Sequence, residues 1–199
     1  MIRFGLIGAG RIGKVHAKTI AANPKAVLAY VADAVPQAAK ELASLHGANV
    51  VAIDDVMSSK DVDAVLIGSP TGFHAEQIQA AANAGKAIMC EKPVSLSVAA
   101  IHETLKVVEK SRSTLLIGFN RRFDPNFSEL ESRILGNAVG DIELITIISR
   151  DPAPPPDYVK GSGGLFHDMM IHDFDMARFL MNEEFVVVQA LGAALVDRV

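Results

Sequence analysis

Residues 2–13 of this 199-residue chain read IRFGLIGAGRIG, and this stretch decides the fold. Its first part, Arg3–Ile7, is mostly apolar and predicts a buried β-strand. The glycines that follow, at positions 8, 10 and 13, are spaced as in a tight turn between a strand and a helix. Such a turn is typical of a βαβ unit, whose two strands lie parallel, so we expect the chain to open with an α/β domain.

Strand-like and helical segments alternate through the first 119 residues. The further strand candidates are Val27–Ala32, Asn49–Ala52, Ala64–Gly68, Ala87–Cys90 and Leu115–Gly118. The clearest helix is Val35–His46, and Thr71 and Ser97 are placed to cap the helices that follow the fourth and fifth strands. This alternation predicts a Rossmann domain over residues 1–119, a doubly wound parallel sheet with helices on both faces.

The pattern changes after residue 119. The predicted elements there are a helix at Asn126–Leu135, a strand at Asp141–Arg150, a proline-rich loop at Asp151–Pro156, a helix at Gly164–Asn182 and a strand at Phe185–Leu195. We expect residues 120–199 to form the N-terminal portion of a second α/β domain with an open sheet. Because this region is short and ends on a strand, we expect that domain to be truncated.

The composition excludes several classes of protein. Half of the residues are hydrophobic and the formal net charge is −4, which favours a packed core and offers no basic patch to a nucleic acid. No apolar run in the sequence reaches the roughly 20 residues of a membrane-spanning helix. Cys90 is the single cysteine, so an intrachain disulfide is impossible and a reducing compartment fits.

The glycine-rich turn predicts a dinucleotide site. Its first glycine allows the tight turn, the second lets the backbone approach a pyrophosphate, and the third lets helix and strand pack closely. Asp33 follows the second strand, where a carboxylate bonds ribose hydroxyls and repels a 2′-phosphate, so we predict NAD rather than NADP. The predicted contacts here are Gly8, Gly10, Arg11, Ile12, Gly13 and Asp33. The alternative is a glycine-rich turn in an unrelated α/β fold.

Two further motifs end the fourth and fifth predicted strands, at the sheet edge where open α/β sheets bind ligands. The cofactor contacts predicted from these motifs are Ser69, Pro70, Thr71, Glu91 and Lys92. The first three residues would line the nicotinamide half of the site, unless they form an ordinary turn. A lysine at the end of a buried strand is costly unless it is paired or functional. Lys92 could hold a substrate hydroxyl and stabilise negative charge on its oxygen, the alternative being a surface lysine.

Asp168 and His172 lie four residues apart and would share one face of the predicted helix. An imidazole titrates near neutral pH, so His172 could act as a general base that removes a hydroxyl proton. Asp168 could bind a neighbouring hydroxyl or orient that imidazole. Two alternatives remain, a pair of satisfied buried polar groups and a metal face completed by Asp175. Because hydride transfer explains the same residues, we predict no metal.

Other polar residues are weaker candidates. Arg122 and Asp151, with Arg121 beside them, could supply the donors and acceptors that a polyhydroxylated substrate needs, or could form a solvated hinge. The histidines at positions 16, 46, 74 and 102 are expected on helix surfaces. Those at 16 and 74 would lie near the crevice, where a minor cofactor contact is conceivable.

Taken together, these residues resemble the Gfo/Idh/MocA oxidoreductase family, and within it the inositol dehydrogenases. The segments that carry the resemblance are Gly8–His16, Glu91–Pro93, Gly118–Asp124, Ser149–Pro156 and Ser162–Arg178. The resemblance implies a catalytic set of Lys92, Asp168 and His172. It also implies NAD-dependent oxidation of myo-inositol to 2-keto-myo-inositol, in the cytoplasm, by a homo-oligomer that is commonly a tetramer. Another polyol or sugar dehydrogenase, or a truncated NAD-binding module without catalysis, remains open.

Overall fold

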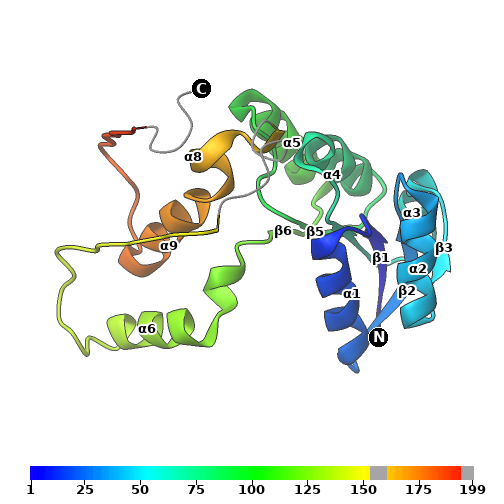
Figure 1. Cartoon of the computed structure of the whole chain (residues 1–199), viewed down its shortest axis with the longest axis horizontal. Coiled ribbons are helices and arrows are strands. Elements are labelled where there is room, and N and C mark those ends of the chain that lie inside the picture. The colour runs from blue at the N-terminus through cyan, green and yellow to red at the C-terminus, as the bar shows by residue number, and fades with distance from the viewer. Residues whose placement is uncertain (153–160, 194–199) are drawn as a thin grey trace. The chain divides into compact units, whose positions relative to one another are not determined.

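The computed structural model describes residues 1–152 and 161–193 (Figure 1). These residues fall into two compact units. The first unit comprises residues 1–119 and 161–169, and the second comprises 120–152 and 170–193. No helix in these ranges is long and apolar enough to cross a membrane.

The first unit is a six-stranded parallel sheet with helices between its strands. The strands are β1 (Ile2–Ile7), β2 (Ala26–Ala32), β3 (Asn49–Val50), β4 (Ala64–Ile67), β5 (Ala87–Cys90) and β6 (Leu115–Ile117). They lie in the order β3-β2-β1-β4-β5-β6, with every neighbouring pair parallel. The predicted Rossmann fold is therefore confirmed. The strand order reverses between β1 and β4, and the crevice at such a switch point is where doubly wound sheets bind ligands.

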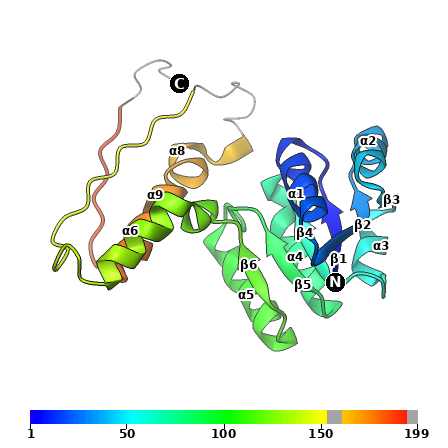
Figure 2. The same ribbon diagram turned by 90° about the horizontal axis from the view of Figure 1, so that it is seen from below.

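The helices of this unit form a layer on each face of the sheet (Figures 1 and 2). They are α1 (Arg11–Ala22), α2 (Pro36–His46), α3 (Ile53–Ser58), α4 (His74–Asn83) and α5 (Val98–Ser111). The unit also contains the five-residue α8 (Gly164–Asp168), which is not part of these layers. One apolar cluster joins the sheet to α1 and α2, and a second joins it to α3, α4 and α5. Since β4 is buried along its whole length, both faces of the sheet are covered at the switch point.

Two predicted helix starts differ in outcome. The Ser97 hydroxyl accepts a hydrogen bond from the Ala100 amide, so the predicted cap of α5 is confirmed. The predicted cap at Thr71 is wrong, because Thr71 opens a short 3₁₀ turn, η1 (Thr71–Phe73), that has no side-chain cap. That turn leads straight into α4, so the helix begins at His74.

The second unit contains the 3₁₀ turn η2 (Asn120–Phe123), α6 (Pro125–Leu135) and α9 (Ile171–Met181). Two predicted strands are not formed: residues 141–150 and 185–193 have no regular strand structure. Both segments are rich in β-branched and apolar residues, but a strand is stable only when its backbone pairs with another. Neither segment pairs with a strand within the described residues. Residues 153–156 of the predicted proline loop and 194–195 of the last predicted strand lie outside the described residues.

The predicted helix Gly164–Asn182 is also wrong as one continuous element. It is divided into α8 and α9 by a turn at Met169 and Met170. The amides of Asp173 and Phe174 both bond the oxygen of Met170, which starts a new helix there. Asp168 therefore ends one helix while His172 lies in the first turn of the next, and the two do not share one helix face.

Candidate functional site

The glycine-rich turn between β1 and α1 has the shape of a phosphate cradle. Gly8 adopts φ +104°, a conformation that favours glycine. A Cβ on Gly13 would lie 1.9 Å from the backbone oxygen of Gly8, so only glycine lets α1 approach the turn this closely. A Cβ on Gly10 would meet nothing within 4 Å, and Gly10 is the N-cap of α1 without a side-chain cap. The amides of the first helical turn therefore face open space, as phosphate binding requires.

Asp33 lies at the end of β2 and ties the second strand to this turn. Its Oδ2 accepts a hydrogen bond from the Ala9 amide at 2.6 Å, and its Oδ1 accepts one from the Val35 amide at 2.7 Å. Each carboxylate oxygen can accept a second hydrogen bond, so both retain capacity for ribose hydroxyls. Together with the open cradle at Gly10, this arrangement fits a dinucleotide.

Lys92 follows β5 and its ammonium is held by Asp168, the last residue of α8. The Nζ atom donates to the backbone oxygen of Asp168 at 2.7 Å and to its Oδ1 at 2.9 Å. The Lys92 side chain is 16% exposed, so this ion pair is shielded from water. An ammonium has three N–H donors, and the third has no acceptor among the described residues. The ammonium is thus fixed by two bonds and keeps one donor that is unused among the described residues.

Glu91, predicted as a cofactor contact, is engaged by another side chain. Its Oε1 lies 2.6 Å from His16 Nε2, which reaches across from α1. The same carboxylate packs against Gly118, where a Cβ would come within 3.1 Å of Oε2. The pair fastens the first helix of the cradle to the strand end that carries Lys92. The sequence analysis did not predict this partner for His16.

The turn after β4 is fastened in a similar way. The Ser69 hydroxyl donates to Gln77 Oε1 at 2.6 Å, and the Ser69 oxygen lies 2.7 Å from His74 Nε2. Pro70 and Thr71 follow at the carboxyl end of β4, on the edge predicted for the nicotinamide. His74 is 1% exposed, so its predicted place on a helix surface is wrong. The signal that could have found it is its spacing, since His74, Ile78 and Ala81 fall on one helix face.

The second unit holds the remaining candidate residues. His172 is half-buried on α9, and Asp151 is exposed. Arg122, predicted to bind substrate, makes two hydrogen bonds to the carboxylate of Asp175, Nε to Oδ2 at 2.8 Å and Nη2 to Oδ1 at 2.5 Å. Its neighbour in η2 makes a parallel pair, Arg121 Nη1 to Asp173 Oδ1 at 2.5 Å. These pairs join η2 to α9, which gives the two arginines a structural role.

The alternative of a metal site finds no support. Among residues 1–152 and 161–193, no group of three or more His, Cys, Asp or Glu side chains is arranged to hold a metal ion. Asp175, the third member of the proposed metal face, is buried and bonded to Arg122. Asp173 is likewise bonded to Arg121 and to the Ser149 hydroxyl.

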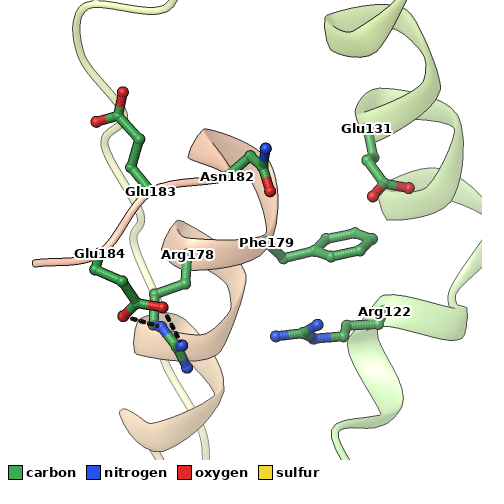
Figure 3. Close-up of a pocket in the computed structure, with 7 residues that line it drawn as sticks. All are labelled: Arg122, Glu131, Arg178, Phe179, Asn182, Glu183 and Glu184. Carbon is green, nitrogen blue, oxygen red and sulfur yellow. Dashed lines mark hydrogen bonds and ion pairs between the residues drawn. The ribbon is translucent and has the colours of Figure 1, made fainter.

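An open pocket of about 400 Å³ lies in the second unit (Figure 3). Its lining residues are Arg122, Glu131, Arg178, Phe179, Asn182, Glu183 and Glu184. The guanidinium of Arg122 lies 5.1 Å from the ring centre of Phe179, and its bonds to Asp175 raise its pKa. Arg178 pairs with Glu184, which lowers the pKa of that carboxyl. Arg178 is thus paired with another residue of the pocket, whereas Arg122 is paired with Asp175, which does not line it.

Comparison with known proteins identifies a family to which this chain is similar. Residues 2–119 match the model of the Gfo/Idh/MocA oxidoreductase family with an NAD-binding Rossmann fold, and residues 127–199 match the C-terminal domain model of the same family. The inositol 2-dehydrogenase of Rhizobium meliloti (strain 1021) is 52% identical over 198 residues, which are 99% of this chain and 60% of that protein. The chain thus spans about 60% of the length of that relative.

Solved structures that are similar to this chain also include inositol dehydrogenases. A myo-inositol dehydrogenase from Corynebacterium glutamicum superposes with a TM-score of 0.86 at 46% identity, over 90% of this chain and 55% of that one. A scyllo-inositol dehydrogenase from Lactobacillus casei, with bound NAD(H) and scyllo-inositol, superposes with a TM-score of 0.84 at 38% identity, over 92% of this chain and 57% of that one. The likeness extends well beyond the Rossmann domain.

Proposed function

This chain belongs to the Gfo/Idh/MocA oxidoreductase family, and we propose that it binds NAD and oxidises a secondary hydroxyl of an inositol to a ketone. The observation that carries the proposal is the Lys92–Asp168 pair. It places an oriented ammonium, with one donor left, at the same edge of the sheet as the glycine cradle. The printed names of two relatives mention myo-inositol and scyllo-inositol.

NAD would lie along the cradle, with its pyrophosphate at the amides of Gly10 and Arg11 and its adenine ribose at Asp33. Ile12 and Gly13 complete the turn, and Ser69, Pro70 and Thr71 would line the nicotinamide side. When bound, NAD supplies the acceptor for a hydride from the substrate carbon. Glu91 would support the cofactor site indirectly, since its carboxylate holds His16 on the first helix.

The roles of the chain's own residues follow from proton balance. Oxidation of a CH–OH group to a ketone removes one hydride and one proton. His172 would take the hydroxyl proton on an imidazole nitrogen, while the Lys92 ammonium stabilises the oxygen as it loses that proton. Asp168 would hold Lys92 in place and accept a neighbouring hydroxyl.

Substrate recognition is proposed to involve Arg122 and Asp151 as well as Asp168 and His172. In Arg122, Nε and Nη2 bond Asp175, and Nη1 has no partner among the described residues. A homo-oligomer in the cytoplasm completes the proposal, on the strength of the family resemblance alone.

The first experiment mixes the purified chain with NAD and myo-inositol and follows NADH by its near-ultraviolet absorbance. Scyllo-inositol and a non-cyclic polyol serve as alternative substrates. NADH formation with an inositol supports the proposal. NAD binding without turnover on any polyol would instead indicate a nucleotide-binding module.

Matched variants test the residues. Lys92→Met should abolish turnover, whereas Lys110→Met, at an exposed position on α5, should not change it. His172→Ala should lower turnover sharply with little change in NAD affinity, because a general base contributes 10²- to 10⁴-fold, roughly, to the rate. Turnover that survives in His172→Ala would exclude His172 as the base.

A further inference from the structure

Two consecutive arginines bind the helix that carries His172. In the second unit, Arg121 and Arg122 lie in η2, and their guanidinium groups bond the carboxylates of Asp173 and Asp175 on α9. Both carboxylates are buried, at 9% and 5% exposed. Hydrogen bonds between charged groups are about twice as strong as neutral ones, and a two-bonded arginine pair also restricts geometry. The two pairs therefore fix α9 at two points.

The position of His172 between these points follows from helical geometry. Successive residues of an α-helix are rotated by about 100° about its axis. Seen down the axis of α9, Asp173 thus lies about 100° to one side of His172, and Asp175 lies about 60° to the other side. His172 therefore falls within the arc between the two bonded carboxylates. A rotation of α9 that displaced the His172 ring would have to distort both pairs.

The other contacts described for α9 do not set its rotation in the same way. Backbone bonds to the Met170 oxygen start the helix, but they lie within this segment and cannot orient it against the rest of the unit. The buried side chains Met176 and Leu180 lie further along the helix than His172. Because hydrophobic attraction is non-directional, the ion pairs are the contacts that restrict the rotation of α9 about its axis.

Asp173, the residue next to His172, is also bonded from a third segment. Its Oδ1 accepts the Ser149 hydroxyl at 2.6 Å as well as Arg121 Nη1 at 2.5 Å. Ser149 belongs to the irregular segment 141–150. A buried carboxylate is stable only when its charge is paired and its lone pairs accept hydrogen bonds, and these two donors meet that need. Three segments of the second unit thus meet directly beside the proposed base.

We propose that Arg121 and Asp173 are positioning residues, which together with Arg122 and Asp175 hold α9 in the rotation that lets His172 reach the substrate hydroxyl. This inference rests on the proposed function in one respect, namely that His172 is the base. Its structural part, that the ion pairs orient the His172 ring, does not require turnover. A displacement of about 1 Å at a reacting group can lower a rate about 100-fold, so loss of a pair should be visible in kcat.

The first test observes the His172 ring in the absence of cofactor and substrate. Carbon–proton NMR spectra of histidine-labelled protein contain one ring signal that is absent in His172→Ala, which identifies it. Arg121→Met changes no residue of α9, and we expect it to move or broaden this signal. The matched control is Arg133→Met, which removes an exposed arginine–carboxylate pair on α6 and should leave the signal in place. The signal of His102, in the first unit, should stay unchanged in both variants.

The second test measures turnover, at a temperature well below the Tm of every variant. We expect Arg121→Met and Asp173→Asn each to lower kcat about tenfold or more, with the KM for NAD nearly unchanged. The double variant should lose about as much as either single variant, because both remove the same interaction. Arg133→Met should turn over as wild type does.

The pH profile separates positioning from a simple effect of charge. Arg121→Met leaves an additional negative charge near His172, whereas Asp173→Asn leaves an additional positive one, so charge alone would shift the two profiles in opposite directions. Loss of positioning lowers the plateau of kcat in both variants, and this is the result that we expect. Profiles that shift in opposite directions with wild-type plateaus would show an electrostatic role and overturn the inference.

Two further results would overturn it: an unmoved His172 signal in folded Arg121→Met, or losses of kcat that add in the double variant. If the wild-type chain has no turnover, the proposed function fails, and the His172 signal still decides whether the ion pairs orient the ring. If Arg121→Met does not fold, Asp173→Asn decides by signal and kcat, because its asparagine is neutral and Arg121, 27% exposed, keeps access to water. A wild-type signal and kcat in that variant would then refute the positioning role.

Discussion

Two glycines of the cradle should respond to the same substitution in opposite ways. Gly13→Ala should make the chain easier to unfold, whereas Gly10→Ala should leave its stability nearly unchanged but weaken NAD binding. The reason is the space that a Cβ would find at each position. At Gly13 it would lie 1.9 Å from the Gly8 oxygen, and at Gly10 it would meet nothing within 4 Å.

The magnitude for Gly13→Ala follows from two opposing terms. Contact at 1.9 Å with a backbone oxygen forces α1 away from the turn by more than 1 Å, roughly, at a cost near the upper end of overpacking penalties, about 3 kcal/mol. Alanine regains at most about 1 kcal/mol of helix propensity. The net loss is about 2 kcal/mol, which lowers Tm by about 4 to 8 °C in a chain of this size.

For Gly10→Ala the structural cost is small. Gly10 has φ −71°, which alanine adopts without strain, and alanine is a poorer N-cap than glycine by about 1 kcal/mol or less. The added methyl group would occupy the space in which a pyrophosphate approaches the helix amides. We therefore expect the dissociation constant for NAD to rise about tenfold or more, which corresponds to about 1.4 kcal/mol.

Circular dichroism melting gives Tm for both variants, and isothermal titration calorimetry gives their affinity for NAD. Two results would refute the reasoning. A Gly13→Ala variant that melts with the wild type would mean that the close approach of α1 is not a real constraint. A Gly10→Ala variant that binds NAD normally would mean that the nucleotide does not lie at these amides.

Three further substitutions test other parts of the molecule. Asp33→Ala should weaken NAD binding and reduce discrimination against NADP, and unchanged selectivity in a two-cofactor titration would contradict that role. Asp175→Asn should destabilise the chain by about 2 kcal/mol in urea unfolding, because it loses the charge of two hydrogen bonds to Arg122, and a variant as stable as wild type would exclude this. Burial raises the pKa of the Cys90 thiol in the folded chain. As pH rises above the pKa of the unfolded thiol, the unfolded chain loses this proton while the folded chain keeps it. The free energy of unfolding therefore falls, by at most about 1.4 kcal/mol per pH unit. Cys90→Ala should therefore lose less stability than wild type between about pH 8 and about pH 10, and equal losses would show that Cys90 does not titrate in this way.

The first unit could be predicted because its information is local. Each buried strand appears as a short apolar run, and the glycine spacing after β1 specifies both the turn and the parallel connection. Ends shifted by one or two residues, as in β3, where the expected Asn49–Ala52 is only Asn49–Val50. A helical segment was expected between the third and fourth strands, but no bounds could be predicted for the short α3, since six residues are too few to show helical periodicity.

The second unit could not be predicted as well, because its structure depends on pairing. Residues 141–150 have the composition of a strand, yet a strand forms only when a partner supplies its hydrogen bonds. Exposed apolar side chains on this segment and on 185–191, such as Leu144, Ile148, Val187 and Leu191, are what unpaired strands would display. Composition predicts which segments can pair, but not whether a partner is present.

The predicted site residues show which kind of inference is safe. Lys92 and Asp168 were each predicted from chemistry, and they lie in contact, although the helix geometry that linked Asp168 to His172 is wrong. Glu91 was predicted to contact cofactor because it lies in the motif, but its carboxylate holds His16. A polar residue beside a motif can therefore either contact a ligand or hold another side chain, and sequence alone does not distinguish these two roles.

A count of donors and acceptors does distinguish them. The two ring nitrogens of His74 are both used by backbone oxygens, so that side chain can position other groups but has nothing left for a ligand. The Lys92 ammonium has three donors and spends two on Asp168, so it is both fixed and able to bind. An active-site group must satisfy both conditions, because a fully free side chain would have to be ordered by the substrate at a cost in binding energy. By this criterion Lys92 is the strongest catalytic candidate in the first unit.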